Sequence, residues 1–177
     1  MEKCCGVVIG ILLVGTWSGF AAEPPMPACS LLTAAEISDA VGMPAGPSQE
    51  SDMVIPEGPS KGETMSMCMW HIGDQDMVSI SVIRAPQGAQ HEVGLAQLNK
   101  TFDMLKAQGW TEERKDFSNT RCAIMTPPSS LQDVPLSTAC LAEAKGMGIS
   151  VGSMSGTKKV AIEKIKTLLD KAIGRLP

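Results

Sequence analysis

Residues 64–83 read TMSMCMWHIGDQDMVSISVI, and this stretch decides the fold. In its second half Val78, Ile80 and Val82 alternate with serines, which is the pattern of a strand with one buried face. The polar run 73–76 between the two halves is typical of a turn. The stretch therefore predicts a hairpin of two antiparallel strands, at 63–72 and 77–85.

Other segments predict three helices and two further strand pairs. Thr33 and Glu36 form a capping box before a short apolar stripe, and Gly42 ends that helix. A second apolar stripe with helical spacing leads to Gly109, and a third approaches the end of the chain. Residues 43–62 are rich in glycine, proline and serine, and we expect a long loop there. The predicted helices are 34–41, 91–108 and 158–174, and the additional strands are 110–117, 121–126, 137–144 and 147–154.

The order of these elements indicates the fold class. A helix is followed by two strands, a second helix, four strands and a final helix. Strands joined by short turns form a mostly antiparallel sheet, and amphipathic helices pack against such a sheet. We therefore predict an α+β fold, with residues 23–177 forming a single domain.

Residues 1–22 have the composition of a secretory signal peptide. After the first three residues the segment is apolar or small throughout, and we expect cleavage after Ala21 or Ala22. The alternative is a retained membrane anchor, for which the apolar run is short. Cys4 and Cys5 precede the apolar run instead of following it, so lipidation is not predicted. The sequence predicts a periplasmic or secreted protein without a stable membrane anchor after processing.

Four cysteines remain after the predicted cleavage, and an even number in an exported chain is typical of disulfides. Four cysteines allow three pairings. Cys122 and Cys140 fall on neighbouring predicted strands, whereas Cys29 precedes the first helix and Cys68 lies in the first hairpin. We favour Cys29–Cys68 with Cys122–Cys140, because this pairing would hold the N-terminal helix against the sheet.

The composition argues against several classes of binding protein. The formal net charge is −4 and there is no basic cluster, so the chain is a poor candidate for binding nucleic acid or anionic lipid. Tyrosine is absent and only 3% of the residues are aromatic. So few aromatic rings argue against a surface that stacks carbohydrates or bases.

Two motifs resemble those of a known family. Residues 29–37 read CSLLTAAEI, with Gly42 closing the helix, and residues 68–70 read CMW in the following strand. Together they resemble a family of exported bacterial proteins of unknown function, many of them actinobacterial lipoproteins. The resemblance implies a PsbP-like sandwich and a bridge between Cys29 and Cys68, and it implies no catalytic residue. This chain departs from the family pattern in lacking a lipidation cysteine and in having a second cysteine pair.

The sequence predicts no enzyme active site and no cofactor. His71 and His91 are the only histidines, and the cysteines are assigned to disulfides. A zinc site is not predicted, because Cys68 and His71 would point to opposite faces of one strand. Paired acids such as those at 112–113 are typical of solvated turns and faces, and the glycines of 146–156 are typical of turns and close packing.

One predicted strand carries residues with a specific ligand chemistry. Four of its side chains alternate along the strand and so share one face, namely Met65, Met67, Met69 and His71. Thioether and imidazole groups suit Cu(I) or Ag(I). Alternatively, the methionines fill irregular apolar contacts with the final helix or with a partner.

These patterns favour one function and leave a second open. We expect an exported, non-enzymatic binding or structural module that acts through contact with a protein or small ligand of the cell envelope. The alternative is a periplasmic, methionine-rich protein that binds Cu(I) or Ag(I).

Overall fold

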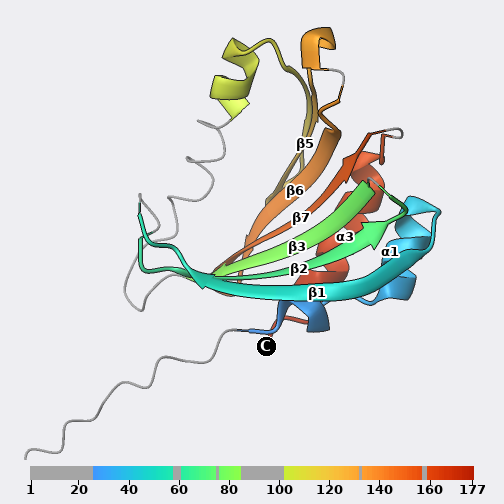
Figure 1. Ribbon diagram of the computed structural model, residues 1–177. Helices are drawn as coiled ribbons and strands as arrows, with labels where there is room; N and C mark the ends of the chain where they lie inside the picture. The colour runs from blue at the N-terminus through green and yellow to red at the C-terminus, as the bar shows by residue number, and fades with distance from the viewer. Residues whose placement is uncertain (1–25, 58–60, 75, 85–101, 132, 157–158) are drawn as a thin grey trace, which may run out of the picture.

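The chain forms one antiparallel sheet with helices packed against it, as the computed structural model shows (Figure 1). The predicted α+β class is confirmed, and each strand pair in the sheet is antiparallel. The signal segment 1–22 and most of the helix predicted at 91–108 lie outside the described residues, although 102–107 are helical. The structure describes residues 26–57, 61–74, 76–84, 102–131, 133–156 and 159–177.

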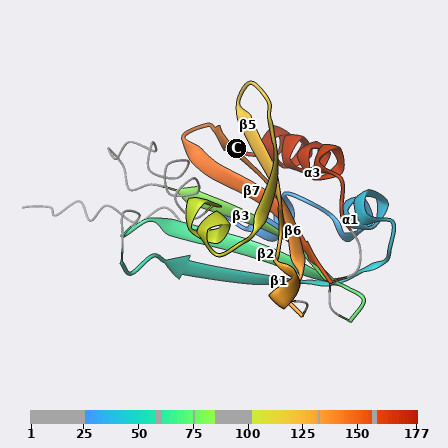
Figure 2. The same cartoon turned by 90° about the horizontal axis from the view of Figure 1, so that it is seen from above.

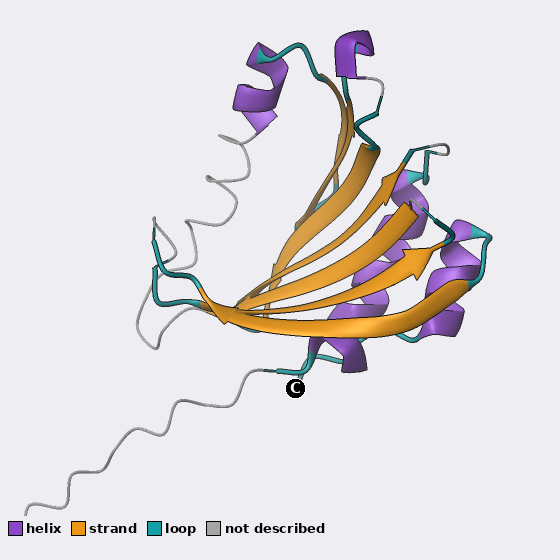
Figure 3. Cartoon of the chain, in the orientation of Figure 1, coloured by secondary structure: helices purple, strands orange, loops and turns teal. Residues whose placement is uncertain are grey.

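The strand order β1-β2-β3-β7-β6-β5-β4 brings the two halves of the chain together. Hairpins connect β2 to β3 and β6 to β7, and the central pair of β3 with β7 sets Ile80 opposite Val151. The sheet is strongly twisted (Figure 3). The strands are β1 (Ala45–Val54), β2 (Thr64–Ile72), β3 (Asp76–Arg84), β4 (Thr111–Asp116), β5 (Thr120–Thr126), β6 (Leu136–Ala144) and β7 (Met147–Ser155).

Strand β1 corrects the prediction of a long loop at 43–62. It is an edge strand that pairs with β2, and its register shifts between Ala45 and Ser48, around Pro47. Most of its side chains are exposed, so it lacks the alternation by which a half-buried strand is recognised. Proline and acidic residues are tolerated because an edge strand has a hydrogen-bonded neighbour on one side only.

The helices α1 (Ala34–Val41) and α3 (Ile162–Gly174) lie together on one side of the sheet (Figure 2). The predicted capping box of α1 is present, and Gly42 ends the helix with a positive φ of 76°. Helix α3 begins later than predicted, because Ala161 is extended and Val160 accepts a hydrogen bond from Thr138 on β6. None of the helices in the described part of the chain combines the length and the apolar content that a bilayer crossing needs.

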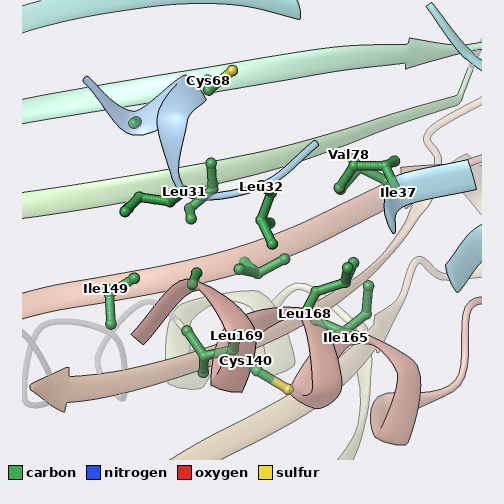
Figure 4. Packing of buried hydrophobic residues seen from close by; sticks show 14 of the residues in the cluster. Leu31, Leu32, Ile37, Cys68, Val78, Cys140, Ile149, Ile165, Leu168 and Leu169 are labelled. Carbon is green, nitrogen blue, oxygen red and sulfur yellow. The ribbon is translucent and has the colours of Figure 1, made fainter. Parts of the chain in front are cut away.

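The main core lies between α1, α3 and the sheet face that they cover (Figure 4). Ile37 from α1 and Leu169 from α3 are fully buried against side chains such as Ile80 and Ile149 from the sheet. Trp70 on β2 belongs to the same cluster. This packing fixes which face of each strand is buried and which is left to other contacts.

Two disulfides cross-link the described chain on the buried face. Cys29, in the 3₁₀ turn Ala28–Ser30, is joined to Cys68 on β2, with their Cα atoms 4.9 Å apart. Cys122 and Cys140 are direct neighbours on β5 and β6, with their Cα atoms 4.0 Å apart. This is the pairing that the sequence analysis favours. The first bridge holds the segment before α1 against the sheet.

Candidate functional site

The candidate site lies on the sheet face opposite α1 and α3, which we call the open face. Along β2 and β3 the buried side chains alternate with half-buried ones, so the second set faces away from the core. Residues 102–107 pack against the same face at its β5 end, where Phe102 contacts a small cluster that includes Ala123 and Met125. The open face includes Met53 on β1, Met65, Met67, Met69 and His71 on β2, Met77, Ser79, Ser81 and Ile83 on β3, Gly148, Ser150, Gly152 and Met154 on β7, and Ser137, Ala139, Leu141 and Glu143 on β6.

The four residues predicted as soft-metal ligands all lie on the open face. An extended strand rises about 3.4 Å per residue, so Met65 and His71 are separated by roughly 20 Å. A single ion cannot reach both ends of that row. The register instead divides these residues between two places on the sheet.

The first place is an apolar cluster at the β1 end of the sheet, which we call the methionine patch. Met65 pairs with Met53 on one side and with Ile83 on the other, and Met67 is the next residue along the face. Met53 is 46% exposed, and the other three are half-buried. The methionine patch therefore consists of Met53, Met65, Met67 and Ile83.

The second place lies near the hairpin turn that connects β2 to β3, and we call it the His71 corner. Met77 is paired with His71 on β2 and with Met154 on β7, so three strands contribute to one row. Met69 precedes His71 by two residues on the same face. The His71 corner therefore consists of Met69, His71, Met77 and Met154.

Small side chains separate these clusters from the far end of the open face. Gly152 lies between Ser79 and Ala139, and a Cβ atom added to it would lie 3.6 Å from the carbonyl oxygen of Thr138. That distance is an ordinary van der Waals contact, so it leaves the prediction of close-packing glycines untested. Because Ser79, Ala139 and Gly152 are small, the methionine side chains beside them extend further from the sheet.

The open face carries two ion pairs at its β4 end and an exposed carboxylate, Glu143, on β6. Lys106 forms a 2.5 Å ion pair with Glu112, and this hydrogen bond raises the pKa of the lysine. Arg114 and Asp116 form a second pair at 2.9 Å, which lowers the pKa of Asp116. Neither pair belongs to the methionine patch or the His71 corner.

Other residues considered for chemistry are kept apart by the fold. Cys68 is buried in its disulfide, whereas His71 is exposed on the opposite face of the same strand. The neighbours Glu112 and Glu113 point to opposite faces and pair with Lys106 and Lys159 respectively. His91 lies outside the described residues.

Two residues of the site could not be found from the sequence. Met53 was placed in a loop, because β1 lacks an alternating pattern. Met154 belongs to a strand that was predicted, but nothing in the sequence shows that β7 lies beside β3. Its signal is only a thioether at an even position of a strand whose odd positions 147, 149 and 151 are apolar.

Comparisons with known proteins bear on the fold. No family model matches the chain, and no curated protein matches its sequence. Among solved structures, the extracellular domain of PknH from Mycobacterium tuberculosis has a similar fold. The TM-score is 0.54 and the identity is 14%, over 86% of this chain and 97% of that chain. At this identity the similarity supports the α+β arrangement and carries no residue role across.

Proposed function

We propose that the chain is a non-enzymatic binding module that acts outside the cytoplasm, in the periplasm or as a secreted protein. Two disulfides support this compartment, because such bonds persist in oxidising surroundings. One solved structure with a similar fold is itself an extracellular domain. The separation of His71 from the buried sulfur atoms gives no support to thiol–imidazole catalysis.

The observation that carries the proposal is the methionine patch. One face of the sheet is covered by α1 and α3, and the other presents thioether side chains that are partly accessible to solvent. Contiguous apolar groups at a surface mark contact sites. Methionine suits such a site, because its flexible side chain adapts to the shape of a partner.

The chemistry of the methionine patch favours an uncharged apolar surface of another protein as its partner. Met53, Met65, Met67 and Ile83 carry no charge. The ion pairs of the open face lie at the opposite end of the sheet, and Glu143 on β6 is separated from Ile83 by Gly148 of β7. Ionic ligands and nucleic acids would find no counter-charge among these four side chains. Apolar contact is the interaction that remains.

A first test measures whether the methionine patch binds an apolar probe. The fluorescence of anilinonaphthalene sulfonate should rise with the native protein and fall in the triple variant Met53→Ser/Met65→Ser/Met67→Ser. A matched control removes apolar surface elsewhere, in Leu131→Ser/Val134→Ser, where the two side chains are 40% and 37% exposed. Equal loss of fluorescence in both variants would contradict a specific apolar site.

A second test locates the partner contact by cross-linking. A benzophenone amino acid replaces Met67 in one sample and Lys164, an exposed residue of α3, in the other. Illumination in an envelope extract should give a discrete adduct from position 67 only, and excess wild-type protein should compete for it while the triple serine variant should not. An adduct made of two copies of this chain, or equal adducts from both positions, would overturn the proposal.

A further inference from the structure

We infer that the His71 corner binds one soft monovalent cation, Cu(I) or Ag(I). The inference deepens the proposed binding function, since the corner lies on the same open face. It does not depend on the methionine patch, which uses other residues. The cation site and the protein-binding role of the methionine patch can therefore be refuted independently.

Register brings the four candidate ligands together. Met77 is flanked on adjacent strands by His71 and Met154, and neighbouring strands lie about 4.8 Å apart. Met69 is diagonal to Met77 across the same strand pair, within the reach of long side chains. An ion bound above Met77 would thus have three thioether side chains and one imidazole within reach on these strands.

The ligand atoms are accessible and match a soft ion. Met154 is 42% exposed and His71 is also exposed, so an ion can enter from solvent, while Met69 and Met77 are half-buried. Thioether sulfur selects Cu(I) over hard cations such as Ca²⁺ and Mg²⁺, which require oxygen ligands. Ag(I) has the same charge and softness.

The adjacent carboxylate does not change this ligand set. Asp76 precedes Met77 in the strand and so points to the other face, where it accepts a 3.0 Å hydrogen bond from the backbone of Gly156. A small pocket at this end of the sheet is lined by Met77 and Met154 and by residues of the helix-covered side, and Met43 in it packs against the main core. The ligand set of the corner is therefore limited to Met69, His71, Met77 and Met154, and Asp76 is held on the other face by Gly156.

The decisive experiment is a competition for Cu(I) against bicinchoninate under anaerobic conditions, with the purified disulfide-bonded protein. The wild type should remove one Cu(I) per chain from the chelator. Met77→Leu and His71→Asn should each weaken binding by at least about tenfold. The matched control is Met65→Leu/Met67→Leu, which changes thioethers of the same strand and face but should leave the affinity unchanged.

A titration with Ag(I), followed by the NMR signals of the methionine ε-methyl groups, assigns the site directly. The methyl signals of Met69, Met77 and Met154 should shift together, and those of Met53 and Met65 should stay in place. Leucine nearly conserves the volume of methionine, so an unchanged circular dichroism spectrum of Met77→Leu excludes misfolding as the cause of lost binding.

Three results would overturn the inference. The wild type could fail to compete for Cu(I), the Met65→Leu/Met67→Leu control could lose as much affinity as Met77→Leu, or the methyl shifts could spread evenly over the methionines. The cross-linking experiment at Met67 reports on the partner surface whichever of these occurs. A protein that cross-links but does not bind Cu(I) would keep the proposed function and lose this site.

Discussion

The ion pair between Glu36 and Arg175 makes a sharp prediction about stability. Arg175 follows α3, and its guanidinium donates to both carboxylate oxygens of Glu36 in the first turn of α1, at 2.7 and 2.8 Å. Glu36 also accepts a hydrogen bond from the backbone of Thr33 and pairs with Lys171. Replacing Glu36 with glutamine removes the charge and keeps an acceptor for the helix cap. We expect this substitution to weaken the connection between the two helices.

The magnitude follows from the titration of Glu36. The hydrogen bond from Arg175 is the main reason why the pKa of Glu36 is lowered from 4.5 to about 2. By linkage, that shift corresponds to at most about 3 kcal/mol of unfolding free energy. The Arg175 side chain is 41% exposed and Glu36 is 16% exposed, so water screens the pair. We therefore expect Glu36→Gln to cost about 1–2 kcal/mol.

The sign of the pH dependence can be tested as well. Because the pKa is lower in the folded state, the stabilisation is complete above about pH 5 and is lost as the pH falls towards 2. Urea unfolding should show a difference between wild type and Glu36→Gln that shrinks over this interval. The control is Glu163→Gln, whose carboxylate pairs with Lys115 but is 63% exposed, and which should leave the unfolding free energy almost unchanged. A difference that stays constant with pH, or that is no larger than the control, would refute the reasoning.

Two further predictions concern the buried side of the sheet. The double variant Cys29→Ala/Cys68→Ala opens a loop with a sequence separation of 39, and Cys122→Ala/Cys140→Ala opens one with a separation of 18. Urea unfolding should show losses of roughly 4 kcal/mol for the first variant and roughly 3 kcal/mol for the second. A larger loss in the second variant would contradict a loop-entropy origin. Thr138→Val leaves the carbonyl of Val160 without its buried 2.8 Å hydrogen bond and should cost about 1–2 kcal/mol. The exposed Thr167→Val, which removes a 2.8 Å bond within α3, should change stability by less than about 0.5 kcal/mol, and similar losses in both would argue against the buried contact.

Local signals in the sequence were sufficient for most elements of the fold. The alternation of Val78, Ile80 and Val82 predicted β3, and the capping box at Thr33 placed the start of α1 where the structure has it. These signals are local, because each strand face or helix end is determined by residues that are close together in the sequence. Strand β1 was not predicted, because most of its side chains are exposed and an exposed edge strand needs no alternation of apolar and polar residues. The start of α3 was misplaced because its first turn is replaced by a tertiary hydrogen bond to Thr138.

The candidate site was only partly accessible to the same reasoning. The period of two along β2 correctly predicted that Met65, Met67, Met69 and His71 share one face. It could not show which of them have neighbours of the same chemistry on other strands. That information depends on register, and register is a property of strand pairs.

The sequence by itself determined the alternation of each strand, the caps of α1 and the number of cysteines available for cross-links, because these depend on residues close together in the chain. Only the tertiary structure decided that β7 lies beside β3 and that β1 covers the edge of β2. Those neighbours are far apart in the chain and meet only in the folded sheet, whose opposite face packs against α1 and α3. Met154 and Met53 reach the open face as a consequence of that packing, from positions 77 and 12 residues away from Met77 and Met65 respectively.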